Sequence, residues 1–227
     1  VLRHADMLSV VNKNMKEKLL QTFTFLDDYK VTVIPNGYDP NDFKNVTPQR
    51  FDKLTILHAG SVYGRRIKYF KLLLETVNNL IQSEEVSIKD FQIIFIGYLA
   101  REARQILSKL RIPNVYYLGV KRHDETIRFM LGADVLLLIP GASDVLTSKI
   151  FEYLAAEKFI LNISDKDGEA FRLIEEMKAG KTVNATVLCD VLREILTFKN
   201  VKVKVNHSKL SKFSRFNLTK ILASKLE

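Results

Sequence analysis

The sequence predicts an α/β protein with a doubly wound, parallel, Rossmann-like sheet. From Leu54 onward, short apolar runs alternate with amphipathic stretches of helical period. This alternation is typical of βαβ units, which build parallel sheets. The run Gln92–Ile96 is almost entirely apolar, as expected for a strand that helices cover on both faces. We therefore predict one parallel sheet between two layers of helices.

The predicted elements can be placed in chain order. The expected strands are Leu54–His58, Gln92–Ile96, Val115–Leu118, Val135–Ile139 and Phe159–Ile163. The expected helices are Tyr69–Ile81, Arg101–Leu110, Asp124–Leu131, Ser148–Ala156 and Glu169–Met177. The segment Val187–Leu196 also has a helical pattern, and a separate helical pattern closes the chain from Phe213 to Leu226.

The first 50 residues are organised differently. Met7–Val11 and Val31–Ile34 have strand patterns, Met15–Phe23 has a helical one, and a turn-rich connector with two prolines and an Asn-Gly pair follows. We interpret residues 1–50 as the tail of a preceding domain plus a linker, and residues 51–198 as the Rossmann-like domain. Residues 199–227 form a basic C-terminal segment with a terminal helix. Since the sequence does not begin with Met, we expect a fragment of a longer chain.

Composition and charge limit the class of protein. The chain is 47% hydrophobic, yet no apolar run approaches the ~18 residues of a membrane span, and its opening is too polar for a signal peptide. One cysteine excludes an internal disulfide and a cysteine-rich metal site. We expect a cytoplasmic protein. The net charge of +9 favours anionic partners and leaves contact with the inner, anionic face of a membrane open.

The segment after the predicted strand Val135–Ile139 points to a ligand. The strand ends in a Pro-Gly loop, a helix opens near Thr147 and Ser148, and Glu152 follows one turn later. Parallel sheets bind ligands at the carboxyl ends of their strands, and free amides at a helix N-terminus favour anions such as a diphosphate. A carboxylate one turn further can accept two hydrogen bonds from the cis-diol of a ribose. The segment therefore predicts a nucleotide-diphosphate site.

Six strings of residues occur in a characteristic order along the chain. They are Ala5–Val10, Ile34–Asp39 with Phe43, Leu54–Gly60, Val115–Gly119, Ala133–Leu138 and Lys149–Ala155. In this order they resemble the retaining glycosyltransferases of the GT-B fold, specifically glycosyltransferase family 4 (group 1), and the resemblance spans nearly the whole chain. In that family, Ile-Pro-Asn-Gly-x-Asp marks the crossing between two Rossmann-like domains.

This resemblance implies a nucleotide-sugar-dependent retaining glycosyltransferase of glycan or polysaccharide biosynthesis. The chain would be mostly the C-terminal, donor-binding domain, and by itself inactive. The donor would be a UDP- or GDP-sugar. A saccharide or lipid-linked acceptor would bind through the missing N-terminal domain.

The same resemblance implies two catalytic candidates, Asp144 and Glu152. Glu152 matches the second Glu of the family's Glu-x7-Glu motif, which contacts the donor ribose. Asp144 stands at the first Glu, near the sugar, and is shorter by a methylene group. The structural alternative for Glu152 is a surface glutamate paired with Lys149, worth ~0.2–0.5 kcal/mol. For Asp144 it is an ordinary loop or cap residue.

Candidate phosphate-binding residues follow the first strand of the Rossmann-like domain. Gly60 allows close approach of the backbone to a phosphate, with turn flexibility as the alternative. Ser61 stands where the family often has Arg, so the positive charge is expected from Arg65 or Arg66, and the sequence leaves open which one. A planar guanidinium suits bidentate contact with phosphate.

Further donor-binding candidates lie at the later strand ends. Ser148 and Lys149 open the helix of Glu152, where a lysine needs a nearby anion. Gly119 and Val120 follow the third strand, at the base-binding edge of the family, where backbone contacts would dominate. His58, His123 and His207 are isolated in the sequence.

No cofactor or metal ion is expected. No cluster of His, Asp or Glu has metal-ligand spacing, the family generally needs no divalent ion, and there is no P-loop string. Two alternatives remain. One is a GT-B-fold UDP-sugar epimerase, against which the Pro-Asn-Gly crossing and the Lys149–Ala155 string count. The other is a nucleic-acid-binding module using Lys199–Lys220 with Phe213 and Phe216. Nucleic acid is not the expected partner, since no basic-aromatic alternation occurs within an OB-fold or RRM pattern.

Overall fold

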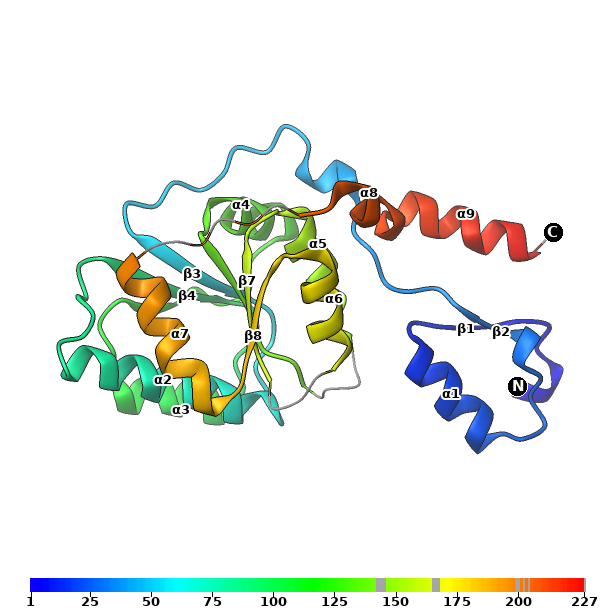
Figure 1. The fold of residues 1–227 in the computed structure, drawn as a ribbon, viewed down its shortest axis with the longest axis horizontal. Coiled ribbons are helices and arrows are strands. Elements are labelled where there is room, and N and C mark those ends of the chain that lie inside the picture. The colour runs from blue at the N-terminus through cyan, green and yellow to red at the C-terminus, as the bar shows by residue number, and fades with distance from the viewer. Residues whose placement is uncertain (142–145, 165–167, 199–200, 202, 204, 227) are drawn as a thin grey trace.

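A six-stranded parallel sheet forms the centre of the protein (Figure 1). The computed structural model describes residues 1–141, 146–164, 168–198, 201, 203 and 205–226, so the predicted catalytic residue Asp144 lies outside the described residues. The strand order is β5-β4-β3-β6-β7-β8. The strands are β3 (Leu54–Ala59), β4 (Phe91–Ile96), β5 (Val115–Tyr117), β6 (Val135–Leu138), β7 (Phe159–Ile163) and β8 (Gly180–Val183). The chain runs outward from β3 through β4 and β5 on one side, and then through β6, β7 and β8 on the other side. This reversal of direction beside β3 is typical of a doubly wound fold.

Helices cover both faces of this sheet (Figure 1). One layer contains α2 (Arg66–Gln82), α3 (Arg101–Leu110) and α7 (Ala185–Phe198). The other contains α4 (His123–Gly132), α5 (Lys149–Ala155) and α6 (Glu169–Met177). The Rossmann-like α/β fold predicted from the sequence is therefore confirmed.

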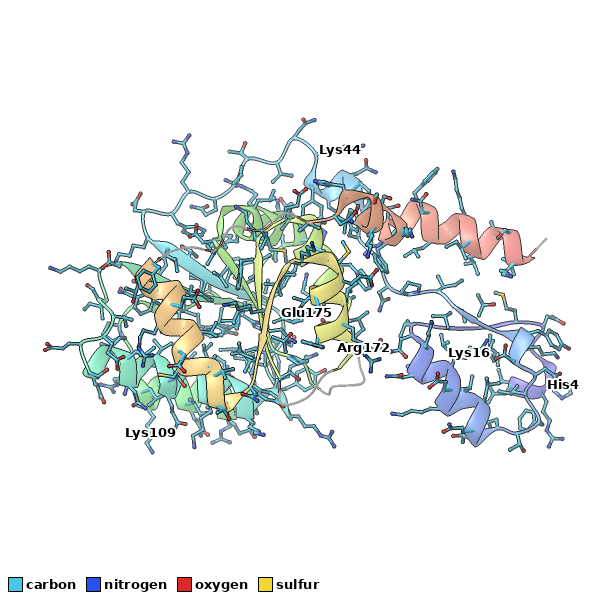
Figure 2. All side chains as sticks on the ribbon, viewed as in Figure 1. His4, Lys16, Lys44, Lys109, Arg172 and Glu175 are labelled. Atoms are coloured by element: carbon cyan, nitrogen blue, oxygen red, sulfur yellow. The ribbon has the colours of Figure 1, made fainter. Side chains whose placement is uncertain are left out.

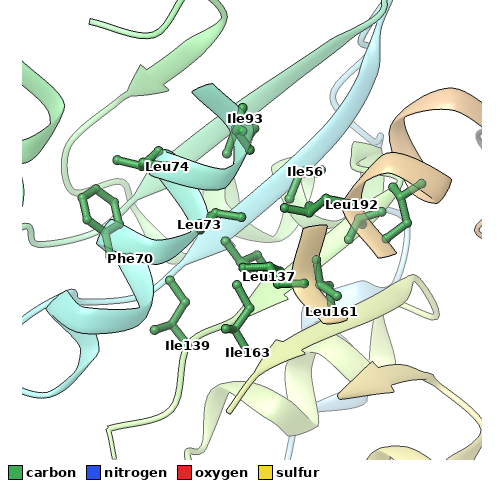
Figure 3. Packing of buried hydrophobic residues seen from close by; sticks show 14 of the residues in the cluster. Ile56, Phe70, Leu73, Leu74, Ile93, Leu137, Ile139, Leu161, Ile163 and Leu192 are labelled. Carbon is green, nitrogen blue, oxygen red and sulfur yellow. The ribbon is translucent and has the colours of Figure 1, made fainter. Parts of the chain in front are cut away.

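Alternation along the strands builds two hydrophobic cores, one on each face. Ile56 of β3 faces the α2 and α7 layer, whereas its neighbour Leu57 faces the α4, α5 and α6 layer. Figure 3 shows the first core, in which Phe70 and Leu73 of α2 and Leu192 of α7 meet strand residues. Each of these side chains is fully buried, which stabilises the fold by about 1.5–3 kcal/mol per residue.

The predicted strands of the large sheet are all present, with ends within one residue of those expected. Helix α2 begins at Arg66, three residues earlier than predicted and shortly after the turn residue Gly64 (φ +54°). Strand β8 was missed. Its sequence, Gly-Lys-Thr-Val, has little strand character, and it exists through pairing with β7 at the edge of the sheet.

The N-terminal segment forms a separate small unit. Strands β1 (Leu8–Val10) and β2 (Val31–Val33) pair in parallel, with α1 (Lys13–Thr22) between them. Asn12 caps α1 by accepting a hydrogen bond from the Met15 amide at 2.7 Å. The strands and the helix predicted for this segment are present, and neither strand joins the large sheet.

The linker after β2 pairs with the C-terminal segment. The Tyr38 amide donates to the Phe213 carbonyl (3.1 Å), and the Arg215 amide donates to the Tyr38 carbonyl (2.9 Å). A Cβ at Gly37 would lie 2.2 Å from the Phe213 carbonyl oxygen, so this approach requires glycine. After α8 (His207–Leu210), α9 (Arg215–Leu226) runs out on the same side of the molecule as β1 and β2 (Figure 1).

The surface of the described chain is strongly charged. Figure 2 shows charged side chains such as Lys44 and Lys109 on the outside of the molecule. No helix in the part of the chain that the structure describes combines the length and the apolar character needed to cross a membrane. Short 3-10 segments complete the fold: Leu2–His4, Asp28–Lys30, Pro40–Phe43 and Ser211–Phe213.

Candidate functional site

Two adjoining cavities form a cleft at the carboxyl ends of the central strands. The first, here called the Arg66 cavity, has a volume of about 270 Å³. The second, the Val120 cavity, has a volume of about 220 Å³. They share Ala59, Gly60, Ser61 and Lys149. This edge of a doubly wound sheet, beside the point where the strand order reverses, is where such folds bind ligands.

Arg66, the first residue of α2, supplies a positive charge to the cleft. Its Nη1 donates to the Ser61 carbonyl at 3.1 Å, and its guanidinium lies over the Tyr63 ring, 5.1 Å from the ring centre. A Cβ at Gly141 would lie 3.5 Å from Arg66 Nε, so the guanidinium sits close to the backbone after β6. The buried Nε has no hydrogen-bond partner among the described residues. The guanidinium is therefore held in place with donor capacity to spare.

Arg65 occupies a different environment. It precedes α2, is exposed and does not line either cavity. Of the two arginines that the sequence could not separate, the geometry favours Arg66 for phosphate contact.

Lys149 and Glu152 form an ion pair on the first turn of α5. Lys149 Nζ lies 2.6 Å from Glu152 Oε2, and the two side chains are 29% and 11% exposed. Lys149 lines both cavities. Glu152 lines neither, but its carboxylate accepts a hydrogen bond from Lys149 Nζ next to the cleft. The structural alternative for Glu152 included this ion pair, but it described a surface glutamate, and a side chain that is 11% exposed is not a surface residue. Because a carboxylate can accept several hydrogen bonds, the pair leaves Glu152 able to bind hydroxyl groups.

A buried hydrogen-bond network fixes the floor of the Arg66 cavity. The Tyr153 hydroxyl accepts from the Ala59 amide (2.8 Å) and donates to the Leu137 carbonyl (3.3 Å). His58 Nδ1 lies 2.9 Å from the same carbonyl. Since a carbonyl only accepts, Nδ1 carries the proton, and Nε2 presents a lone pair. Burial, aided by the charges of Arg66 and Lys149, lowers the pKa of His58 to about 4 despite the Leu137 hydrogen bond.

The backbone at the cleft is packed through glycines. Gly97 has φ +122°, and a Cβ there would lie 2.3 Å from the Gly60 carbonyl oxygen. The Gly60 amide donates to the Ile96 carbonyl at 2.8 Å. The Gly60 amide is therefore engaged within the fold. Because Gly60 has no side chain, the space next to His58 stays open: a Cβ at Gly60 would lie 3.2 Å from His58 Nε2.

The Val120 cavity lies on the β4 and β5 side of the cleft. Gly97, Tyr98, Val120, Lys121 and Thr126 line it together with the four shared residues and Ile96. Tyr98 and Val120 are 53% and 75% exposed. The predicted residue Gly119 does not line the cavity, but its carbonyl accepts from the Gly97 amide at 2.9 Å and so holds the loop behind it.

The structure brings most of the predicted site residues to one cleft. Those lining it are Gly60, Ser61, Arg66, Val120, Ser148 and Lys149. Arg65, Gly119 and Glu152 do not line it. The sequence analysis missed the roles of His58, Tyr63, Tyr98 and Tyr153. His58 could have been found because it ends a predicted strand of a parallel sheet, where such sheets bind ligands.

Among the residues that the structure describes, no group of three or more His, Cys, Asp or Glu side chains could hold a metal ion. We predict that nucleotide binding survives EDTA, because Arg66 and Lys149 supply the positive charge that a metal ion would otherwise provide. Calorimetry before and after chelation would measure it. An affinity that collapses with EDTA and returns with Mg²⁺ or Mn²⁺ would contradict this prediction.

The chain has the fold of the GT-B glycosyltransferases. HepE of Anabaena, solved with UDP and glucose, is similar with a TM-score of 0.75 at 14% sequence identity, over 99% of this chain and 64% of HepE. A glycosyltransferase of Rickettsia africae ESF-5 gives 0.70 at 17%, over 99% of this chain and 63% of that protein. Sucrose-phosphate synthase of Thermosynechococcus elongatus gives 0.73 at 15%, over 98% and 58%.

The chain thus spans less than two thirds of the length of each of these proteins. At such identities the likeness concerns the fold. No protein-family model matches the sequence, and no curated protein sequence does.

Proposed function

We propose that this chain is the nucleotide-sugar-binding part of a retaining glycosyltransferase, with a UDP- or GDP-sugar as donor. The observation that carries the proposal is the Arg66 cavity. Two cationic side chains, Arg66 and Lys149, line a partly buried cavity at the ligand-binding edge of the sheet. HepE, which has a similar fold, has been solved with UDP-glucose and with UDP.

The size of the cleft supports a ligand larger than a phosphate ion. The adjoining cavities of about 270 and 220 Å³ together fall within the ~300–1,000 Å³ typical of small-molecule sites. A diphosphate beside Gly60 and Ser61 would lie where the cavities meet. The nucleoside would then extend into the Val120 cavity and the sugar into the Arg66 cavity.

In this proposal the chain acts mainly on the leaving group. As the bond from sugar to phosphate breaks, negative charge grows on the departing diphosphate. Arg66 and Lys149 stabilise that charge from fixed positions, which lowers the barrier without reorganisation at the moment of reaction. Glu152 holds the ribose through its hydroxyls, and Asp144 remains the proposed contact to the sugar.

The acceptor side of the proposed reaction would come from a domain beyond this chain. The small β1–α1–β2 unit is too short to form a second Rossmann-like domain, and the chain spans 64% of HepE. We propose that a saccharide or lipid-linked acceptor binds on the missing domain, in glycan or polysaccharide synthesis.

We expect the isolated chain to bind UDP or GDP and to transfer no sugar. The donor cleft is present, whereas the proposed acceptor domain is not. Thermal-shift and calorimetric titrations with both nucleotides would measure binding, and release of free nucleotide from UDP- or GDP-sugars in the presence of saccharide acceptors would measure transfer. Absence of binding to either nucleotide would overturn the proposed function. Transfer at ordinary enzymatic rates would overturn only the assignment of the acceptor to another domain.

The structure does not favour the nucleic-acid alternative. Phe213, a proposed stacking platform for bases, instead packs against the buried Phe151 with ring centres 5.0 Å apart. Phe216 is exposed, but Lys220 lies over its ring, with Nζ 4.4 Å from the ring centre. Neither ring offers the open pair of faces on which successive bases stack.

A further inference from the structure

His58 is a deeply buried titratable group of the cleft. It lies at the end of β3, is 4% exposed and lines the Arg66 cavity. Its Nδ1 donates to the Leu137 carbonyl, which fixes the ring and the position of the proton. The other ring nitrogen, Nε2, is buried and has no hydrogen-bond partner among the residues that the structure describes. A buried polar atom without a partner is uncommon, since it costs free energy unless a ligand or water satisfies it.

The chemistry of Nε2 limits what it can contact. A neutral imidazole with a protonated Nδ1 offers only a lone pair at Nε2, so it accepts hydrogen bonds and repels other acceptors. Burial and the charges of Arg66 and Lys149 lower the pKa of His58 to about 4. The ring is therefore neutral near pH 7, and a phosphate oxygen, which is an acceptor, is a poor partner for Nε2. A hydroxyl group is a good one.

Two further unpartnered atoms belong to residues lining the same cavity. Thr147 Oγ1 and Arg66 Nε are both buried, and neither has a hydrogen-bond partner in the described part of the chain. Nε can only donate, a hydroxyl can donate or accept, and Nε2 of His58 can only accept. A ligand that satisfies all three carries at least one hydroxyl beside an acceptor group, and an anionic acceptor best matches the charge of Arg66. The sugar-phosphate end of a nucleotide sugar has this composition.

We propose that His58 is a specificity-determining residue for the donor sugar, with Nε2 accepting a hydrogen bond from one hydroxyl of the transferred sugar. The inference rests on the proposed nucleotide-sugar function and goes beyond it by separating the cavity into two parts. Arg66 binds the phosphate, and His58 distinguishes sugars by whether they place a hydroxyl at Nε2.

The test compares ligands with and without the sugar in three proteins: wild type, His58→Phe and His58→Gln. The Phe ring approximates the size of imidazole but removes the acceptor, whereas the Gln amide restores one. The Leu137 carbonyl keeps its hydrogen bond from Tyr153 in both variants. The ligands are UDP, UDP-glucose and UDP-glucose lacking one sugar hydroxyl at a time. If the wild type binds GDP instead of UDP, GDP-mannose and its deoxy series replace them.

We expect His58→Phe to bind UDP within about twofold of wild type but UDP-glucose about tenfold more weakly, as for a lost hydrogen bond that leaves its hydroxyl partner unsatisfied. His58→Gln should recover part of that loss. In the wild type one deoxy sugar should show the same loss, and that analogue should lose nothing further in His58→Phe.

Three results would overturn the proposal. Equal losses for UDP and UDP-glucose in His58→Phe would assign His58 to the phosphate or to the fold. Unchanged affinity of His58→Phe for UDP-glucose would show that Nε2 does not contact the sugar and that water satisfies it instead. If His58→Phe bound every deoxy analogue more weakly than the wild type does, no single sugar hydroxyl could be the partner of Nε2. A wild type that binds neither UDP nor GDP is a different failure, because it contradicts the proposed function itself.

Discussion

Replacing Glu152 with Gln should weaken the binding of a ribonucleoside diphosphate by roughly tenfold or more, since charge-assisted hydrogen bonds are worth ~1.5–3 kcal/mol each. The carboxylate is assigned to two ribose hydroxyls, and an amide accepts with only one oxygen. The side chain is 11% exposed, so water does not readily replace the lost contact. Calorimetry with UDP or GDP would measure the change. Asp144→Asn, assigned to the sugar, should hardly affect a plain diphosphate.

The Lys149 ion pair calls for a control with a deoxyribose diphosphate. Glu152→Gln also weakens the hold on Lys149 Nζ, now 2.6 Å away, and a freer lysine would bind phosphate differently in every nucleotide. The ribose contact alone distinguishes the two ligands. Wild type should therefore prefer the ribose form, and Glu152→Gln should lose that preference. Equal ribose preference in both proteins would reduce Glu152 to the partner of Lys149.

Replacing Arg66 with Ala should cost roughly tenfold to a hundredfold in affinity for the same diphosphate, from hydrogen bonds to a charged group worth ~1.5–3 kcal/mol. Arg65→Ala is the matched control. It removes the same charge at the neighbouring residue, which is exposed and lies outside both cavities. We expect it to remain within about twofold of wild type. Titration of both variants with UDP or GDP would measure the difference.

The comparison separates contact from general charge. Equal, modest losses in both variants, reduced by added salt, would indicate only the field of a basic surface. A larger loss in Arg65→Ala would reverse the assignment made from the structure. Because the Arg66 guanidinium also packs over Tyr63 and donates to Ser61, thermal unfolding of each variant should accompany the titrations.

Much of the fold could be predicted because its rules are local. Successive side chains of a strand point to opposite faces, as Ile56 and Leu57 do. Because both are apolar, adjacent residues in the sequence already predict a strand that is covered on two sides. Gly37 could be placed in a tight connector for the same reason. Strand β8 could not, because Gly180–Val183 becomes a strand only through its pairing with β7.

The candidate site could be predicted only in part. Gly60 and Lys149 were found because each adjoins a predicted strand or helix. Arg65 and Arg66 are adjacent, and no local pattern distinguishes them. The backbone at Gly141 and the ring of Tyr63, which surround Arg66, decide which side chain faces the cleft.

The sequence by itself determined the class of fold, the edge of the sheet that holds the cleft and the basic character of the site, since these follow from periodicity, strand ends and composition. Only the tertiary structure decided the state of His58. Its ring is held by Leu137, 79 residues away, beside a hydroxyl from Tyr153 on α5. The orientation of an imidazole and the nitrogen that carries its proton depend on such distant partners, and these meet only when β6 pairs with β3 and α5 packs on the sheet.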